Sequence, residues 1–322
     1  MTFFWMKYVG PGLFRSRQGR PKNILRPAWN SGINPRQKES CADARGKTAN
    51  FSGAGAMKIR SLPVALVVVL CLCGSLAKAR GTESSRRVIP LESAAGAFRA
   101  YVLEQLDQSV AGARMMRDRI AAHDLEGAQR AWLAARGGWE ASEVVTAEYF
   151  PDLDRAIDGW PDAARGFHAI EAQLFGAHTT DALPAADELL GNLMEFQRQL
   201  QSTTLTAQRL LNGVTRLTYE IGEDKAGGGE SPFSGNSLAE IGSNVSAIAA
   251  VYHRVLAPTA KEKKPEFSVR IAAELDRLNA LVAAPSLREL DQTALRELSE
   301  ILTDDLAGLG QLLGLERPSL GN

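Results

Sequence analysis

The sequence predicts an all-α protein, and three observations lead to this fold class. Apolar residues after Leu91 recur at intervals of three and four, which is the period of an amphipathic helix. Prolines separate the periodic stretches, at positions where one helix ends or the next begins. The alternating pattern of a half-buried strand does not compete in this part of the sequence. Long helices with short connections are typical of antiparallel bundles.

The first two predicted helices carry the clearest apolar stripes. One stripe consists of Phe98, Val102, Leu106, Val110 and Ala113, and the other of Trp132, Ala135, Trp139, Ser142 and Val145. Asp124, just before the second stripe, has the side chain of an N-cap. We expect helices over residues 91–122, 125–149, 162–177, 185–201, 203–225, 236–257, 266–283 and 287–314. Residues 225–237 (KAGGGESPFSGNS) are rich in Gly and Ser, which predicts either a loop over a site or a turn between bundles.

Residues 57–79 have the order of a secretory signal peptide. Lys58 and Arg60 precede an apolar core from Val64 to Leu72, and Ala77-Lys78-Ala79 resembles a cleavage site. We therefore expect an exported mature chain that begins near Arg80, so that residues 80–322 form the helical domain. An uncleaved anchor is the alternative, but the apolar run is short for a membrane-spanning helix. Residues 1–56 are basic and lack a hydrophobic period, which indicates a disordered extension or one that is not translated.

Charge and cysteine positions exclude several classes of function for residues 80–322. Residues 1–79 hold 13 of the 37 basic residues but two of the 37 acidic ones, so 24 basic and 35 acidic residues follow. Such an acidic surface does not suit nucleic acid. The three cysteines, Cys41, Cys71 and Cys73, all precede the expected cleavage point. The mature chain is therefore expected to have no disulfide, no disulfide-linked partner and no thiolate metal site.

Two acidic patterns suggest a metal site. His168 and Glu171 are three residues apart, so they share one helix face and could reach one ion, although a lone histidine among apolar residues is also compatible with a packed core. Glu140 and Glu143 repeat this spacing on the preceding helix, beside its apolar stripe. Carboxylates and histidines from adjacent helices can meet in a bundle core. The connection between the two helices adds further acids at Asp152, Asp154 and Asp158.

Residues 124–158, 166–176 and 217–248 resemble the imelysin-like family, and most of all its periplasmic iron-binding members of Efe-type iron-uptake systems. The similarity runs from about residue 90 to about residue 258 and more weakly beyond, and its hallmark is the Gly-x-His-x-x-Glu element at residues 166–171. The resemblance implies a pair of antiparallel four-helix bundles, a periplasmic location, and an iron permease and a periplasmic peroxidase as partners. The implied metal residues are Glu140, Glu143, His168 and Glu171, with Asp154 or Asp158 as an acidic neighbour. The chain departs from Efe-type members at Ser234-Gly235-Asn236-Ser237, where those members have Ser-His-Thr-Asp.

Three functions follow as hypotheses. The first is a periplasmic metal-binding protein in iron uptake, because one imidazole with several carboxylates favours iron or manganese, with zinc and calcium as alternatives. The second is a metallopeptidase, although the His-Glu-x-x-His pattern of a zincin is absent from the sequence. The third is a helical scaffold or adhesion protein without metal. We expect the other histidines, His123, His178 and His253, to be exposed, and Glu220 and Glu223 to lie near the site without binding the metal.

Overall fold

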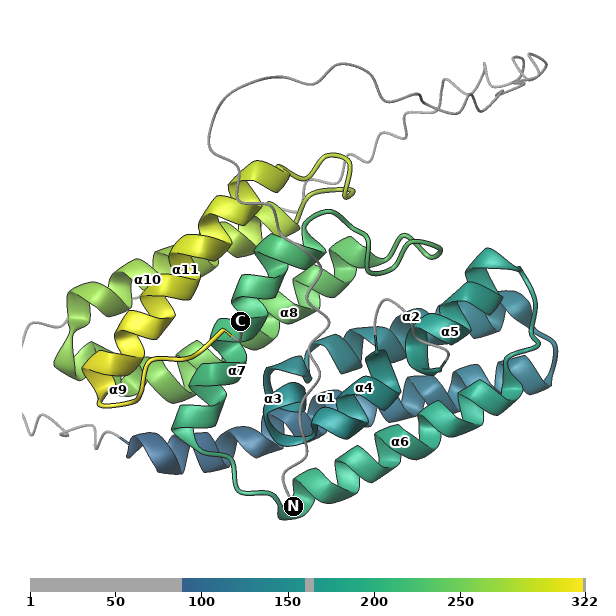
Figure 1. The fold of residues 1–322 in the computed structure, drawn as a ribbon, viewed down its shortest axis with the longest axis horizontal. Helices are drawn as coiled ribbons and strands as arrows, with labels where there is room; N and C mark the ends of the chain where they lie inside the picture. The colour runs from purple at the N-terminus through teal and green to yellow at the C-terminus, as the bar shows by residue number, and fades with distance from the viewer. Residues whose placement is uncertain (1–88, 160–164, 321–322) are drawn as a thin grey trace, which may run out of the picture. The chain divides into compact units, whose positions relative to one another are not determined.

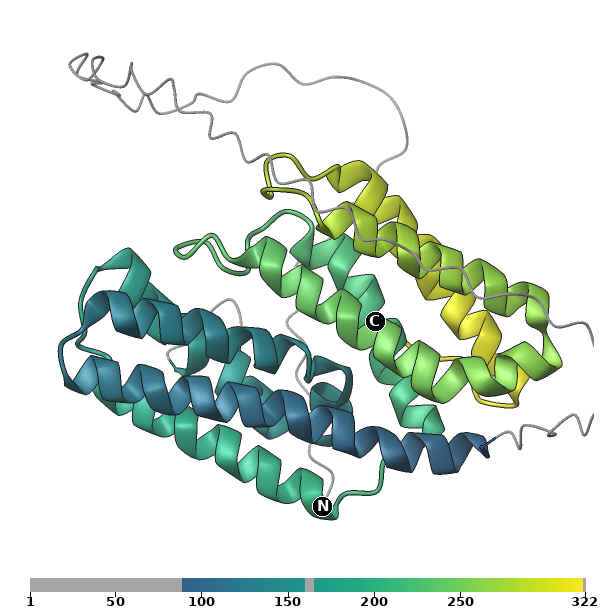
Figure 2. The ribbon, with the colours of Figure 1, turned by 180° about the vertical axis from the view of Figure 1, so that it is seen from behind.

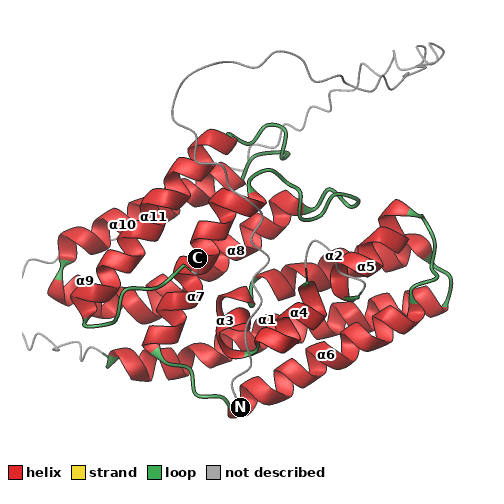
Figure 3. Ribbon diagram, viewed as in Figure 1, coloured by secondary structure: helices red, strands yellow, loops and turns green. Residues whose placement is uncertain are grey.

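The computed structural model describes residues 89–159 and 165–320 (Figure 1). Within these residues every regular element is helical (Figure 3), which confirms the all-α prediction. The predicted signal peptide, the extension at residues 1–56 and the predicted start of a helix at residue 162 lie outside the described residues. None of the described helices is both long enough and apolar enough to cross a membrane.

The first group of helices packs around α1 (Leu91–Ala121). This helix contacts both α2 (Leu125–Glu140) and α6 (Leu183–Ser202), as Figure 2 shows from behind. The shorter helices α3 (Glu143–Tyr149), α4 (Pro151–Asp158) and α5 (Gly166–Glu171) follow α2, and α4 and α5 both contact α6. The residues of both predicted apolar stripes are buried in this group. Asp124 caps α2 as predicted, since its Oδ1 accepts a hydrogen bond of 2.9 Å from the Gly127 amide.

The second group consists of α7 (Ala207–Glu220), α8 (Ser237–Val251), α9 (Ala257–Lys263), α10 (Pro265–Val282) and α11 (Gln292–Leu313). In this group α11 packs on α7 and α10, and α8 packs on α7 and α10. The two groups also touch each other, because α3 contacts α7 and α2 contacts α8. A Cβ atom on Gly213 of α7 would lie 2.0 Å from the carbonyl oxygen of Val144 in α3, so glycine permits this approach.

Three of the differences between the predicted and the observed helices have a clear local cause. The helix expected over 125–149 breaks at Ala141-Ser142, where Ser142 Oγ donates to the Gly138 carbonyl at 2.8 Å and competes with the helical pattern. The acids at 152–158 lie on α4 and not in an irregular connection, since Pro151 suits the first turn of a helix. The last helix begins at Gln292 and not at residue 287, because Asp291 Oδ1 caps it through the Ala294 amide at 3.0 Å.

Three helices contain a π-helical stretch, which no sequence period predicted. These stretches are η1 (Ala172–Gly176), η2 (Ile221–Lys225) and η3 (Tyr252–Leu256). One added residue in a helical turn rotates all later side chains by about 100° about the helix axis. The stretch η1 follows Glu171 directly, and η2 ends at Lys225, so two of the three adjoin the site described below.

Candidate metal centre

Three helix ends, the short helix α5 and one loop bring four acidic side chains and a histidine to a single point. Glu140 ends α2, Glu143 begins α3 and Asp158 ends α4, while His168 lies on α5 and Glu230 lies in the loop at residues 226–236, the glycine-rich loop. Their ligand atoms form two overlapping groups, and within each group the atoms lie within 4.8 Å of one another. One group consists of Asp158, His168 and Glu230, and the other of the carboxylates Glu140, Glu143, Asp158 and Glu230. We call these five residues the acidic cluster.

Asp158 lies at the centre of the acidic cluster. Its Oδ1 is 3.0 Å from His168 Nε2, and its Oδ2 accepts a 2.6 Å hydrogen bond from the indole Nε1 of Trp139. Arg136 also forms an ion pair with Oδ1. Burial alone would raise the pKa of Asp158, but Arg136 and His168 together hold this pKa well below its ordinary value. The carboxylate is therefore charged at neutral pH.

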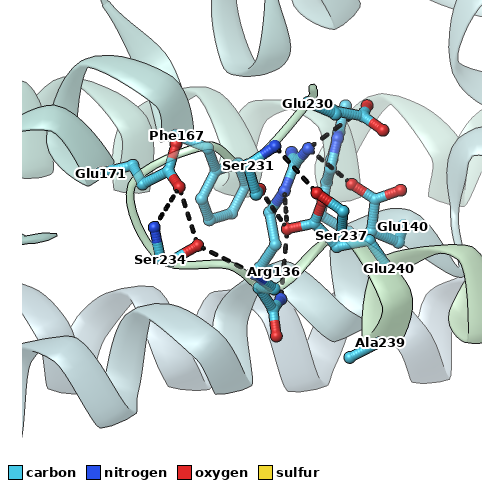
Figure 4. Close-up of polar contacts among 12 residues, drawn as sticks. Arg136, Glu140, Phe167, Glu171, Glu230, Ser231, Ser234, Ser237, Ala239 and Glu240 are labelled. Atoms are coloured by element: carbon cyan, nitrogen blue, oxygen red, sulfur yellow. Dashed lines mark hydrogen bonds and ion pairs between the residues drawn. The ribbon is translucent and has the colours of Figure 1, made fainter. Parts of the chain in front are cut away.

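Arg136 is a fixed positive charge beside the acidic cluster. Its side chain is fully buried, and its guanidinium reaches Glu140 at 2.7 Å and Glu240 at 3.2 Å, with Glu230 farther away at 3.5 Å (Figure 4). The guanidinium also lies 5.3 Å from the centre of the Phe167 ring, on which it stacks. Since Arg136 belongs to the interior of α2, its position is set by the helix.

Lys225 is a second positive charge and lies within the acidic cluster itself. Its Nζ is 2.8 Å from Glu143 Oε2, 3.0 Å from Glu140 Oε2 and 3.1 Å from Glu230 Oε1. Burial would lower the pKa of Lys225, but these three carboxylates raise it well above the ordinary value. The ammonium is therefore charged although it is buried.

Helix α8 holds two of the glutamates in place. Asn244 Nδ2 donates to Glu140 Oε2 at 3.0 Å and to Glu143 Oε2 at 2.8 Å. Four residues earlier on the same helix, Glu240 Oε1 accepts from Ser231 Oγ at 2.6 Å and from Asn236 Nδ2 at 3.1 Å. These bonds connect the glycine-rich loop and α8 to the ends of α2 and α3.

Acidic side chains outnumber basic ones at this point. Six carboxylates meet three basic groups: Glu140, Glu143, Asp158, Glu171, Glu230 and Glu240 face Arg136, Lys225 and His168. Protons make up part of the difference, because burial raises the pKa of Glu143 well above its ordinary value and that of Glu230 to about 7. Burial opposes the charged form of His168, but its bonds to Asp158 and Glu171 raise its pKa to about 9. The site therefore holds protons where a metal ion would supply positive charge.

Glu171 lies at the edge of this arrangement. Its Oε1 accepts three hydrogen bonds from the glycine-rich loop: from the amide of Ser234 at 2.8 Å, from Ser234 Oγ at 2.7 Å and from the amide of Phe233 at 3.2 Å. Its Oε2 is 3.9 Å from His168 Nδ1. Figure 4 shows Glu171 facing Ser234, away from Glu140 and Glu230. Glu171 thus contacts both the histidine and the loop.

A cavity of about 550 Å³ opens beside the acidic cluster. Its lining includes Glu143, Asp158, Lys225 and Glu230 from the centre, together with Asp154 of α4. Burial raises the pKa of Asp154 above its ordinary value. Glu220 and Glu223 line the same cavity, so they lie near the site as expected, and Glu220 forms an ion pair with Arg216.

The structure brings together four of the six predicted metal residues, Glu140, Glu143, Asp158 and His168. Glu171 and Asp154 lie next to this group and outside the atoms that converge. His123, His178 and His253 are exposed, as predicted. Sequence reasoning missed four contributors to the site, namely Arg136, Lys225, Glu230 and Glu240. Of these, only Arg136 could have been predicted from the sequence, because it lies four residues before Glu140 and therefore on the same helix face.

Comparisons with known proteins point in one direction. Residues 96–313 match the family model Peptidase_M75, which is described as imelysin. The iron uptake system component EfeO of Escherichia coli K12 is 27% identical over 252 residues, which cover 72% of this chain and 67% of that protein, and EfeO of Shigella flexneri matches to the same extent. The fold is similar to the crystal structure of a protein from Parabacteroides distasonis described as an iron-regulated protein A precursor. That match has a TM-score of 0.58 at 16% identity and covers 69% of this chain and 94% of the other.

Proposed function

The chain belongs to the imelysin family, and we propose that it is an exported, periplasmic metal-binding protein that acts in iron uptake. One observation carries this proposal: an imidazole and four carboxylates from five separate segments form two overlapping groups that share Asp158 and Glu230, and the ligand atoms of each group lie within 4.8 Å of one another. A metal ion would provide the missing positive charge. Carboxylate oxygens and one imidazole nitrogen are a donor set that suits iron and manganese, with zinc and calcium as alternatives.

We propose Glu140, Glu143, Asp158 and His168 as ligands, with Glu230 added from the glycine-rich loop. We propose that Glu171 and Asp154 support the site from positions beside the ligands. Glu171 contacts His168 and the glycine-rich loop, and Asp154 adds negative charge to the cavity. A second layer of hydrogen bonds supports this assignment. Trp139 orients Asp158, and Asn244 orients Glu140 and Glu143, as expected around metal ligands.

The similarity to EfeO supports a role in an Efe-type system, for which we propose an iron permease and a periplasmic peroxidase as partners. Export through the signal-peptide-like residues 57–79 would bring the protein to the compartment where such a system takes up iron. The two helix groups are proposed to correspond to two antiparallel four-helix bundles, with the site where α2 and α3 of one meet α7 and α8 of the other.

Titration calorimetry with Mn²⁺ and, without oxygen, with Fe²⁺ tests the proposal. The wild-type protein is expected to bind one ion per chain. His168→Ala and Asp158→Asn are each expected to weaken binding by at least about 100-fold, since the loss of a residue that only supports a ligand already costs about 10 to 100-fold. His253→Ala is the matched control, because His253 is exposed on η3 and belongs to neither group of converging ligand atoms.

Equal binding by the wild-type protein and His168→Ala would contradict the proposed site. A wild-type protein that binds neither ion would contradict the proposed function. Hydrolysis of a peptide by the metal-loaded protein, lost in Asp158→Asn, would favour the peptidase hypothesis.

A further inference from the structure

We propose that Lys225 is a tethered cation that occupies the place of the metal ion, so that metal binding expels its ammonium group from the acidic cluster. This inference rests on the proposed function, since it concerns how that site is filled when no metal is bound. It assigns Lys225 a role in setting affinity and selectivity, and it does not make Lys225 a ligand.

The position of the ammonium carries the inference. Nζ lies between 2.8 and 3.1 Å from three carboxylates, Glu140, Glu143 and Glu230. The same three side chains, with Asp158, form the four-carboxylate group whose oxygens lie within 4.8 Å of one another. Two of the three N–H donors of the ammonium form hydrogen bonds with Glu140 and Glu143, and Glu230 forms an ion pair with the same ammonium. Lys225 therefore fills the space between the carboxylates and offsets part of their charge.

A metal ion cannot share these oxygens with the ammonium. Hard cations lie about 2.0 to 2.6 Å from carboxylate oxygens, whereas the Lys225 ammonium already lies about as close as hydrogen bonding allows to the same groups. Both cations would then be within contact distance of each other, and like charges repel strongly where water is excluded. Binding of the metal therefore requires Lys225 to leave.

A lysine at position 225 suits a side chain that metal binding displaces, whereas the arginine at position 136 suits a side chain that remains in the site. Arg136 forms ion pairs with four carboxylates from the interior of α2 and stacks on Phe167. Lys225 has a flexible four-carbon chain and a compact charge that forms no fixed fork with a carboxylate. After residue 79 the sequence contains 20 arginines but four lysines, so a lysine here is a departure from the usage of the chain.

The π turn directs Lys225 toward the acidic cluster, and the loop and cavity beside it leave space for the displaced side chain. Lys225 is the last residue of η2, and without the added residue of the π turn its side chain would point about 100° away. The glycine-rich loop follows at once, with Gly228 in the left-handed region at φ 72°. Glu220, Glu223 and Asp224 line the adjoining cavity with Lys225, so an expelled ammonium has other carboxylates within the same cavity.

A tethered ammonium also selects among cations. Na⁺ and K⁺ carry the same charge as the ammonium and have no tether, so they gain little by replacing it. A divalent or trivalent ion brings more charge to the same oxygens and can displace it. Lys225 thus keeps the carboxylates in place before metal arrives and excludes monovalent ions from the site.

Lysine labelling of the wild-type protein tests the movement directly. The full chain is treated with an acylating reagent with and without saturating Mn²⁺, and modified peptides are quantified by mass spectrometry. Lys225 is expected to react slowly without Mn²⁺ and several-fold faster with it. Lys261, Lys263 and Lys264 are exposed controls whose labelling should not change. Unchanged or slower labelling of Lys225 in protein that has bound Mn²⁺ would overturn the inference.

Substitution provides an independent test by calorimetry with Mn²⁺. Lys225→Met is expected to bind Mn²⁺ at least tenfold more tightly than the wild-type protein and to lose affinity when NaCl is raised, whereas Lys225→Arg, which keeps the charge, should show no gain. Equal or weaker binding by Lys225→Met, with wild-type binding intact, would overturn the inference alone. Binding by Lys225→Met but not by the wild-type protein would mean that the ammonium occupies the place of the metal without leaving it, which would overturn both the displacement and the proposed function. Binding by neither protein would contradict both.

Discussion

Glu171 uses its two carboxylate oxygens for different neighbours. Oε1 accepts three hydrogen bonds from Phe233 and Ser234, while Oε2 faces His168 Nδ1 at 3.9 Å. Hydrogen bonds to a charged acceptor are stronger than neutral ones, so this one side chain holds the middle of the glycine-rich loop against α5. Glu171 therefore connects the histidine of the site to the loop that carries Glu230.

Removal of this carboxylate should release the loop. In Glu171→Ala, three donors lose their acceptor, at a cost of about 1 to 3 kcal/mol, and the amides of Phe233 and Ser234 should exchange hydrogen much faster than in the wild-type protein. Glu171→Gln keeps an acceptor oxygen, so its loop should remain protected and its Mn²⁺ affinity should stay within a few-fold of wild type. Hydrogen exchange measured by mass spectrometry decides the first point. A large loss of Mn²⁺ affinity in Glu171→Gln would instead make Glu171 a direct ligand.

The indole of Trp139 should affect metal binding without touching the metal. The ring centres of Trp139 and Phe196 are 5.9 Å apart. Trp139→Phe keeps an aromatic ring against Phe196 but removes the N–H group that donates to Asp158 Oδ2. We expect a loss of stability of about 1 to 3 kcal/mol and a Mn²⁺ affinity about 10 to 100-fold lower, because Asp158 loses its orientation.

Trp132→Phe is the matched control for this prediction. Trp132 is also fully buried, and its Nε1 donates to the Phe167 carbonyl at 3.1 Å, away from the carboxylates. Its loss should lower the melting temperature to a similar degree and leave Mn²⁺ affinity nearly unchanged. Equal effects of the two substitutions on affinity would show that Trp139 acts through packing and not through Asp158.

At the scale of elements, the close contact between α3 and α7 positions Glu143 opposite Lys225. Gly213→Ala would place a methyl carbon 2.0 Å from the Val144 carbonyl, and a backbone atom cannot move aside. Overpacking of this kind costs about 1 to 3 kcal/mol, and we expect weaker Mn²⁺ binding as α7 shifts away from α3. Thermal melts and calorimetry on the same samples measure both effects.

Gly191→Ala is the corresponding control on α6. Apart from the backbone of its own helix, nothing lies within 4 Å of a Cβ at this position, so alanine should stabilise the helix by about 0.5 to 1 kcal/mol and leave metal binding unchanged. Stabilisation by both substitutions would mean that the approach of α3 to α7 is looser than the structure describes.

The elements that the sequence predicted well are those with a long apolar period. The stripes of α1 and α2 were readable because each repeats over several turns and faces one core. The break at Ala141-Ser142 and the π turns were not, since each depends on one or two backbone bonds that a period of 3.6 does not reveal. This is also why Lys225 was missed: its inward direction depends on η2 and not on its spacing from other residues.

At the scale of the whole molecule, the site combines residues found by spacing with residues found only by folding. Glu140, Glu143 and His168 were recognisable because they lie on helices beside an apolar stripe, and the family resemblance supported them. Glu230 lies in the glycine-rich loop, 62 residues after His168, where no local pattern tells which core a side chain enters. The excess of carboxylates could be anticipated from the sequence, but its balance by Arg136 and Lys225 could not.

Metal binding should strengthen as pH rises. Glu230 has a pKa of about 7 and His168 a pKa of about 9 without metal, so near neutral pH both hold protons that a metal must displace. We expect the Mn²⁺ dissociation constant to fall by about tenfold or more between pH 6 and pH 8. Calorimetry in two buffers of different ionisation enthalpy measures the protons released. Binding that is independent of pH and releases no proton would contradict the charge assignment.

The folding stability of the metal-free protein should decrease as pH rises. The folded pKa of Glu230, about 7, lies above its ordinary value of 4.5, so the folded state holds more protons than the unfolded state between these values. Its contribution therefore lowers stability as pH rises from about 4.5 to about 7, and the loss of the proton from His168 continues this trend toward pH 9. Melting temperatures with chelator at pH 5.5, 7 and 8.5 should decrease in that order, and an increase across this range would be inconsistent with the assignment.

The central claim is that one metal ion binds among Asp158, His168 and the neighbouring glutamates. A crystal of the protein grown with Mn²⁺ or Fe²⁺, measured with X-rays above and below the absorption edge of that metal, locates the ion without relying on activity. We predict one anomalous peak bounded by Asp158, His168 and Glu230, with Glu140 and Glu143 on its other side and with the Lys225 ammonium moved away. A peak at another place in the molecule, or none in protein that calorimetry shows to be saturated, would contradict the account.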